Sequence, residues 1–166
     1  SLRPYENKLC FSVVLEIDEN AKVLKEWIGK TIIQSNKRFT YEEVQKIIET
    51  KKGDYADEIL ILNSLAKKLR TKRFAEGSIN FESKEVKFKL DEKTGKPLEI
   101  YIKEMKDSNR LVEEFMLLAN KTVAKSINKL NLKEQPVFVY RVHDEPAPEK
   151  ITDFALFVSK LGYNIK

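Results

Sequence analysis

The segment 111–120 reads LVEEFMLLAN, and its pattern decides how the surrounding sequence is interpreted. Apolar residues recur at helical spacing on both sides of this segment and predict one long helix over about 107–128. Within it, residues 111–119 are apolar on all sides except at Glu113 and Glu114. A helix of this kind is typical of a protein interior, so we expect it to be buried on most sides.

Glu113 and Glu114 are therefore unusual neighbours. Adjacent side chains on a helix point about 100° apart, so at most one of the two faces open solvent. A carboxylate inside an apolar environment must find a partner, because its desolvation is costly. Two interpretations stay open: a buried acid held by backbone donors or an arginine, or an acid that lines a substrate pocket.

The chain before this helix predicts a hairpin followed by two helices. Residues 10–17 and 23–33 alternate as strands around the polar turn 18–21. Thr40 and Glu43 have capping-box spacing and start a short helix. A second helix is expected over 55–73, with Asp54 as its N-cap. The basic side chains in 67–73 are expected to form a solvated surface at its end.

Further strands are predicted over 79–81, 86–90 and 98–102, and a short buried strand over 137–140. Pro148 opens a final helix. Strands and helices in this mixed order predict an α+β fold, with a mixed sheet and packed helices in one domain.

Composition narrows the class of protein only weakly. The 166 residues are 42% hydrophobic and carry a net charge of +5, which is compatible with a polyanionic partner but not diagnostic of one. The single cysteine, Cys10, fits a reducing cytoplasm. No apolar run is long enough to span a bilayer, so no membrane partner is expected.

A search for catalytic groups returns little. The chain has no Gly-rich phosphate loop, and His143 is its only histidine. Its seven aspartates are scattered over turns and helix starts, whereas two-metal phosphodiester chemistry needs converging carboxylates. We therefore predict no metal site and no catalytic residue in this chain. Tyr41 and Phe81 are either core aromatics or platforms on which nucleobases stack.

Four stretches, taken in order, resemble ribonuclease R of the ribonuclease II superfamily. They are SLRP at 1–4, DYADEI at 54–59, LVEEFMLLAN at 111–120 and YRVHDEP at 140–146. The likeness extends over almost the whole chain. It implies a Mg²⁺-dependent enzyme that digests single-stranded RNA from the 3′ end and releases nucleoside monophosphates.

The resemblance also implies that residues 1–166 are a single incomplete domain, internal to the RNB catalytic domain of such an enzyme. The family's Asp-rich metal motif lies upstream of the first residue, and an arginine-bearing segment that contacts the substrate phosphates lies downstream of the last. Mg²⁺ would therefore act in the complete enzyme, with none expected on this piece.

Three residues match substrate-binding positions of the family. Phe81 matches the aromatic residue that stacks on the terminal bases. Tyr41 and Glu113 match residues that distinguish RNA from DNA, Glu113 through a contact with the ribose 2′-hydroxyl. The sequence thus predicts part of an exoribonuclease that is inactive in isolation. The alternatives are a non-catalytic RNA-binding α+β module and a scaffold without nucleic-acid contacts.

Overall fold

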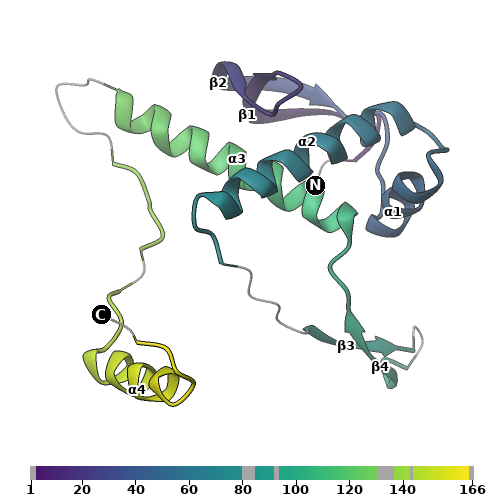
Figure 1. Cartoon of the computed structure of the whole chain (residues 1–166). Coiled ribbons are helices and arrows are strands. Elements are labelled where there is room, and N and C mark those ends of the chain that lie inside the picture. Colours follow the sequence, from purple (N-terminus) through teal and green to yellow (C-terminus); the bar gives the residue numbers. More distant parts are fainter. Residues whose placement is uncertain (1–2, 80–84, 92–93, 131–136, 143, 165–166) are drawn as a thin grey trace. The chain divides into compact units, whose positions relative to one another are not determined.

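The computed structural model describes residues 3–79, 85–91, 94–130, 137–142 and 144–164. The chain divides into two compact units, Ser1–Lys129 and Leu130–Lys166. The elements of the first unit are β1 (Asn7–Ile17), β2 (Val23–Gln34), α1 (Tyr41–Thr50), α2 (Ala56–Ala75), β3 (Glu85–Leu90), β4 (Pro97–Lys103) and α3 (Asp107–Lys129), and the second unit contains α4 (Pro148–Ser159) (Figure 1). The predicted α+β class is confirmed.

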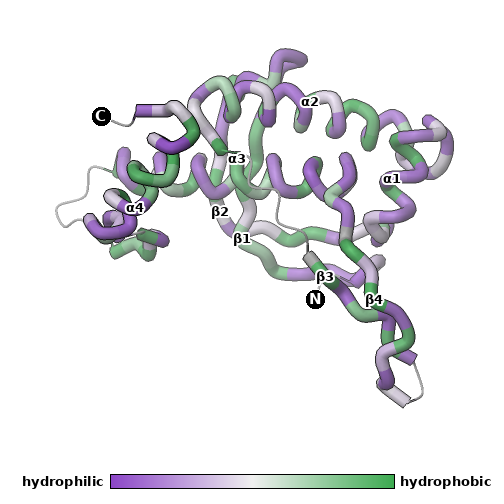
Figure 2. Tube along the Cα trace, turned by 60° about the horizontal axis from the view of Figure 1, so that its bottom comes forward, coloured by the Kyte–Doolittle hydropathy of each residue, from purple (hydrophilic) through white to green (hydrophobic). Residues whose placement is uncertain are grey.

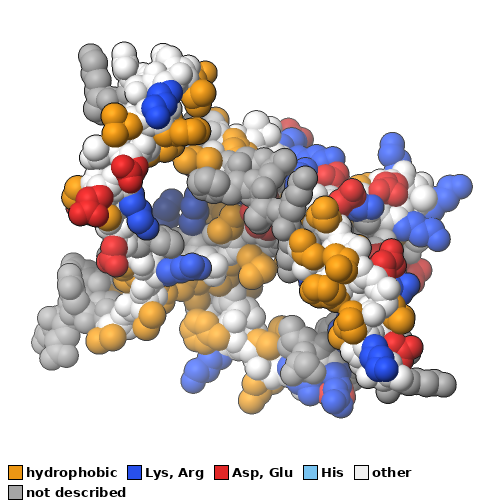
Figure 3. Space-filling model, turned by 90° about the horizontal axis from the view of Figure 1, so that it is seen from below, with side chains coloured by type: hydrophobic (Ala, Val, Ile, Leu, Met, Phe, Trp, Pro, Cys, Tyr) orange, Lys and Arg blue, Asp and Glu red, His pale blue; other side chains and the backbone are white. Residues whose placement is uncertain are grey.

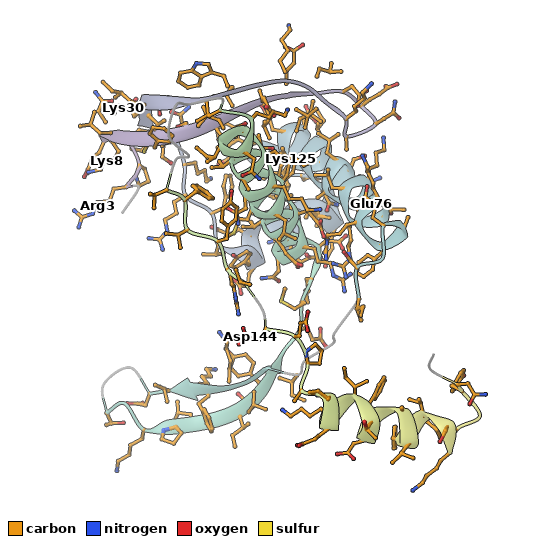
Figure 4. All side chains as sticks on the ribbon, turned by 90° about the vertical axis from the view of Figure 1, so that its left-hand side faces the viewer. Arg3, Lys8, Lys30, Glu76, Lys125 and Asp144 are labelled. Carbon is orange, nitrogen blue, oxygen red and sulfur yellow. The ribbon has the colours of Figure 1, made fainter. Side chains whose placement is uncertain are left out.

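β1 and β2 form the predicted antiparallel hairpin, in register from Asn7 opposite Gln34 to a shift beside Ile17. Asp18 shapes its turn, because the Oδ1 atom accepts the backbone N–H groups of Asn20 at 2.9 Å and Lys22 at 2.8 Å. This local hydrogen bonding is the usual reason for an aspartate at a turn. Figure 4 shows Lys8 and Lys30 on this hairpin.

One face of the hairpin carries exposed apolar side chains. Leu9 pairs with Ile32 across the strands, and these side chains are 87% and 69% exposed. Phe11, two residues along the same face, is 71% exposed. Other exposed apolar side chains are visible as orange atoms in Figure 3. The buried hydrophobic residues of the described chain are few and small in comparison: Ala21, Ile47, Ile59 and Ala66.

The predicted capping box begins α1. The Glu43 backbone N–H donates to Thr40 Oγ1 at 3.2 Å, and the Thr40 N–H donates to Glu43 Oε2 at 2.7 Å. The predicted cap of α2 was wrong. Tyr55, in the left-handed region at φ 57°, is its N-cap, and Asp54 instead forms an ion pair with Lys37.

Helices α1, α2 and α3 contact one another and enclose the small core of the first unit. Hydrophilic and hydrophobic residues are interspersed along α2 and α3 (Figure 2). Ile47 of α1 and Ile59 and Ala66 of α2 are buried there. The polar contact that fixes α1 against the start of α3 is the Ser108 N–H, which donates to Gln45 Oε1 at 3.1 Å.

The expectation that segment 111–119 is buried on most sides was wrong. Met116 is 60% exposed and Val112 also lies at the surface, whereas the buried residue of the segment is the charged Glu114. The reason is that α1 and α2 are the helices that contact α3, so its far side stays open. A periodicity that indicates apolar faces does not reveal which of those faces the chain itself covers.

β3 and β4 form a second antiparallel hairpin, from Glu85 opposite Lys103 to Leu90 opposite Pro97. The strands predicted over 86–90 and 98–102 are thus confirmed, while most of the predicted strand 79–81 lies outside the described residues. In the part of the chain that the structure describes, the strands pair within these two hairpins, and no mixed sheet joins them.

In the second unit α4 begins with Pro148 at the first turn, as predicted, and none of its residues is buried. The buried strand predicted over 137–140 was wrong. Val137 and Val139 are 100% and 89% exposed, and no described strand pairs with the segment. Phe138 and Tyr140 instead pack edge to face, with their ring centroids 4.9 Å apart. Four apolar residues in a row indicate a strand only where a partner strand is available.

Candidate functional site

Tyr41 is the first residue of α1, directly after the Thr40 cap, and its side chain is 46% exposed. The ring therefore lies at the surface and not in the core. One helical turn later on the same side of α1, Gln45 accepts the Ser108 N–H at the start of α3. The fold thereby places Tyr41 on the helix that is fastened to the N-terminal part of α3.

Phe81, the residue predicted to stack on bases, lies outside the described residues, as does His143. The stretches that flank Phe81 are the C-terminal end of α2 and strand β3.

Glu113 and Glu114 of α3 share one arginine of α2. Arg73 holds Glu114 with two hydrogen bonds, from Nη2 to Oε1 at 2.5 Å and from Nε to Oε2 at 3.1 Å. The same Nη2 atom donates to Glu113 Oε1 at 3.2 Å. The planar guanidinium fork suits a bidentate pair of this kind, and its remaining N–H reaches the second carboxylate.

The two carboxylates differ in exposure. The Glu114 side chain is 2% exposed and the Glu113 side chain 38%. Of the two interpretations left open by the sequence, the buried acid held by an arginine therefore describes Glu114. Glu113 is the acid that a ligand in solution can reach.

Arg70 and Phe74 complete the cluster. Arg70 Nη1 lies 3.6 Å from Glu114 Oε1, so two arginines face the two glutamates. The guanidinium carbons of Arg70 and Arg73 lie 4.7 Å and 5.0 Å from the Phe74 ring centroid, which is the range of a cation–π contact. The α2–α3 charge cluster is our name for five side chains: Arg70, Arg73, Phe74, Glu113 and Glu114.

The cluster corrects the expectation that the basic residues 67–73 are a solvated surface. Lys67, Lys68 and Lys72 are exposed, but the side chains of Arg70 and Arg73 are only 21% and 18% exposed. The hydrogen bond to Glu114 is the largest cause that raises the pKa of Arg73 above its ordinary value, against the effect of burial. Arg73 is therefore charged at all ordinary pH values.

The described residues do not fit a metal ion. No group of three or more His, Cys, Asp or Glu side chains within the described ranges could hold one. The glutamates of the α2–α3 charge cluster are already paired with arginines. Nor does a helix in these ranges have the length and apolar character required to cross a bilayer.

Comparison with known proteins identifies the family. The RNB domain matches residues 1–165. The chain is 37% identical over 180 residues to DIS3-like exonuclease 2 of Schizosaccharomyces pombe, which covers 99% of this chain and 19% of that protein. It is 33% identical over 172 residues to ribonuclease R of Aquifex aeolicus, covering 100% of this chain and 24% of that protein. This chain belongs to the RNB domain family, as the ribonuclease R resemblance predicted.

One solved structure and one further relative are also similar to this chain. Mycoplasma genitalium RNase R in complex with ribose methylated single-stranded RNA has the same fold, with a TM-score of 0.82 and 23% identity over 98% of this chain and 25% of that one. The Arabidopsis thaliana protein named inactive exonuclease DIS3L2 is 33% identical over 181 residues, covering 99% of this chain and 17% of that protein. The chain thus spans about a fifth of the length of these curated relatives.

Proposed function

We propose that this chain is the substrate-recognising part of an exoribonuclease that degrades single-stranded RNA from its 3′ end. The observation that carries the proposal is the RNB match over residues 1–165, together with relatives named as exonucleases and ribonuclease R. The chain is an internal part of a single RNB domain in this proposal. In this proposal the Mg²⁺ is held by residues of the complete enzyme other than residues 1–166, and the enzyme acts in the cytoplasm.

Tyr41, Phe81 and Glu113 are the proposed RNA contacts. The exposed ring of Tyr41 and the reachable carboxylate of Glu113 support roles at the substrate, because a buried side chain could not touch it. A carboxylate is an acceptor, and the ribose 2′-hydroxyl is the donor that DNA lacks. Glu113 would therefore favour RNA, and Phe81 would stack on a terminal base.

Degradation of a 5′-labelled single-stranded RNA with Mg²⁺ tests the proposal. The protein encoded by the whole reading frame should shorten the RNA from the 3′ end and release nucleoside monophosphates. The 166-residue chain alone should release none, since its described residues offer no metal site. DNA of the same sequence is the matched control. Release of mononucleotides by the chain alone would contradict the proposal that this chain recognises the substrate while other parts of the enzyme hold the metal.

A non-catalytic RNA-binding module is the second candidate, and the similarity to a relative named inactive favours it. It predicts that the whole protein binds single-stranded RNA without degrading it. Fluorescence anisotropy at two salt concentrations separates this module from a scaffold without RNA contacts, because phosphate binding weakens as salt rises.

A further inference from the structure

The two carboxylate oxygens of Glu113 differ in the hydrogen bonds that they accept from the described residues. Arg73 Nη2 donates to Oε1 at 3.2 Å, whereas Oε2 has no hydrogen-bond partner among the residues that the structure describes. The side chain is 38% exposed, so its carboxylate can be reached by a donor from solution.

The arginine that holds Glu113 is itself held firmly. Two hydrogen bonds to the buried Glu114 and the contact with the Phe74 ring fix its guanidinium plane. Glu114 offers little to a ligand directly, because its side chain is 2% exposed. The cluster is therefore a fixed support, and Glu113 is its carboxylate that a ligand can reach.

We propose that Arg73 is a positioning residue for RNA selectivity: it orients the Glu113 carboxylate so that Oε2 accepts the ribose 2′-hydroxyl. This inference rests on the proposed ribose-sensing role of Glu113. Arg73 acts through Glu113 and makes no contact with the RNA, and Glu114 anchors Arg73.

The substitution Arg73→Lys separates the effect of the positive charge from the effect of the guanidinium geometry. Its ammonium keeps the positive charge, but it lacks the planar fork that reaches both glutamates at once. Freed from this restraint, the Glu113 side chain would have to be ordered anew by each bound RNA. The conformational entropy that is lost when a glutamate side chain is fixed in one rotamer corresponds to about a tenfold change in affinity.

The test compares binding of single-stranded RNA with DNA of the same sequence to the protein encoded by the whole reading frame. Fluorescence anisotropy in EDTA gives the two dissociation constants without degradation. We expect Arg73→Lys to reduce the preference for RNA about tenfold by weakening RNA binding alone. In a Glu113→Ala background, which has no side-chain acceptor left to position, Arg73→Lys should cause no further change.

Other outcomes overturn the inference in distinguishable ways. If Glu113→Ala reduces the preference and Arg73→Lys does not, Glu113 keeps its proposed role and the positioning by Arg73 is refuted. If Glu113→Ala leaves the preference unchanged, the ribose-sensing role itself fails.

Equal losses of RNA and DNA affinity in Arg73→Lys, with a lower melting temperature, mean that Arg73 only supports the fold, which also refutes the inference. If Arg73→Lys is unfolded at the assay temperature, both dissociation constants are measured at a lower temperature at which circular dichroism shows that it is folded. The same reduction of the RNA preference is expected there, and an unchanged preference refutes the inference.

Discussion

Truncation of Glu114 should destabilise the protein far more than truncation of its neighbour Glu113, although both contact the same arginine. Glu114→Ala removes two hydrogen bonds and leaves Arg73, whose side chain is 18% exposed, with Glu113 as its remaining carboxylate partner among the described residues. Breaking a fully buried ion pair costs about 3–5 kcal/mol. Since Arg73 keeps Glu113 and some access to water, we expect about 2–3 kcal/mol. Glu113→Ala removes one contact of a carboxylate that is 38% exposed, for which we expect about 0–1 kcal/mol.

Urea unfolding of the purified chain, followed by far-ultraviolet circular dichroism of the helices, measures both losses. With a slope of about 2 kcal/mol per molar urea, the midpoint should fall by about 1–1.5 M for Glu114→Ala and by less than about 0.5 M for Glu113→Ala. Glu114→Gln, which keeps the shape but not the charge, should lie between them. Equal shifts for the two alanine variants would refute the assignment of Glu114 as the buried anchor.

Two further substitutions test local structure. Thr40→Ala should lower the free energy of unfolding by about 1 kcal/mol, because it removes the side-chain acceptor of the capping box. Thr40→Ser should keep most of that stability. The urea midpoint measures both variants, and an unchanged midpoint for the alanine variant would count against the cap. Gly29→Ala should displace the Trp27 ring, because a Cβ atom would lie 2.5 Å from its Cζ2 atom. The fluorescence of Trp27, the chain's only tryptophan, should therefore change, and an unaltered emission spectrum would contradict this contact. The stability should change by less than about 1 kcal/mol, since the exposed ring can move and alanine restricts the unfolded chain.

The parts of the fold that depend on neighbours in sequence were predictable. The first hairpin follows from alternation around a polar turn, and the capping box from the spacing of Thr40 and Glu43. The long helix predicted over 107–128 is observed as Asp107–Lys129. Each of these features is set by local backbone hydrogen bonds and side-chain periodicity, which a single sequence displays.

The candidate site depends on a contact that the sequence does not display. Arg73 and Glu114 lie on different helices and are separated by β3 and β4, so no spacing rule connects them. The run of basic residues in which Arg73 occurs has the composition of a solvated helix end, although Arg73 and Arg70 face α3. The sequence left two interpretations open for the two glutamates, and one of them was a buried acid held by an arginine. The packing of α2 on α3 shows that this buried acid is Glu114.

The α2–α3 charge cluster restricts how this sequence can change over generations. Its two arginines and two glutamates sum to zero charge, and three of the four side chains are mostly enclosed. A single replacement of Arg73 or Glu114 by a neutral residue leaves an uncompensated charge, so the mutational path to a neutral pair passes through a less stable protein. These two positions should therefore either stay fixed or change together, whereas the exposed Lys67, Lys68 and Lys72 on the same helix are free to drift one at a time.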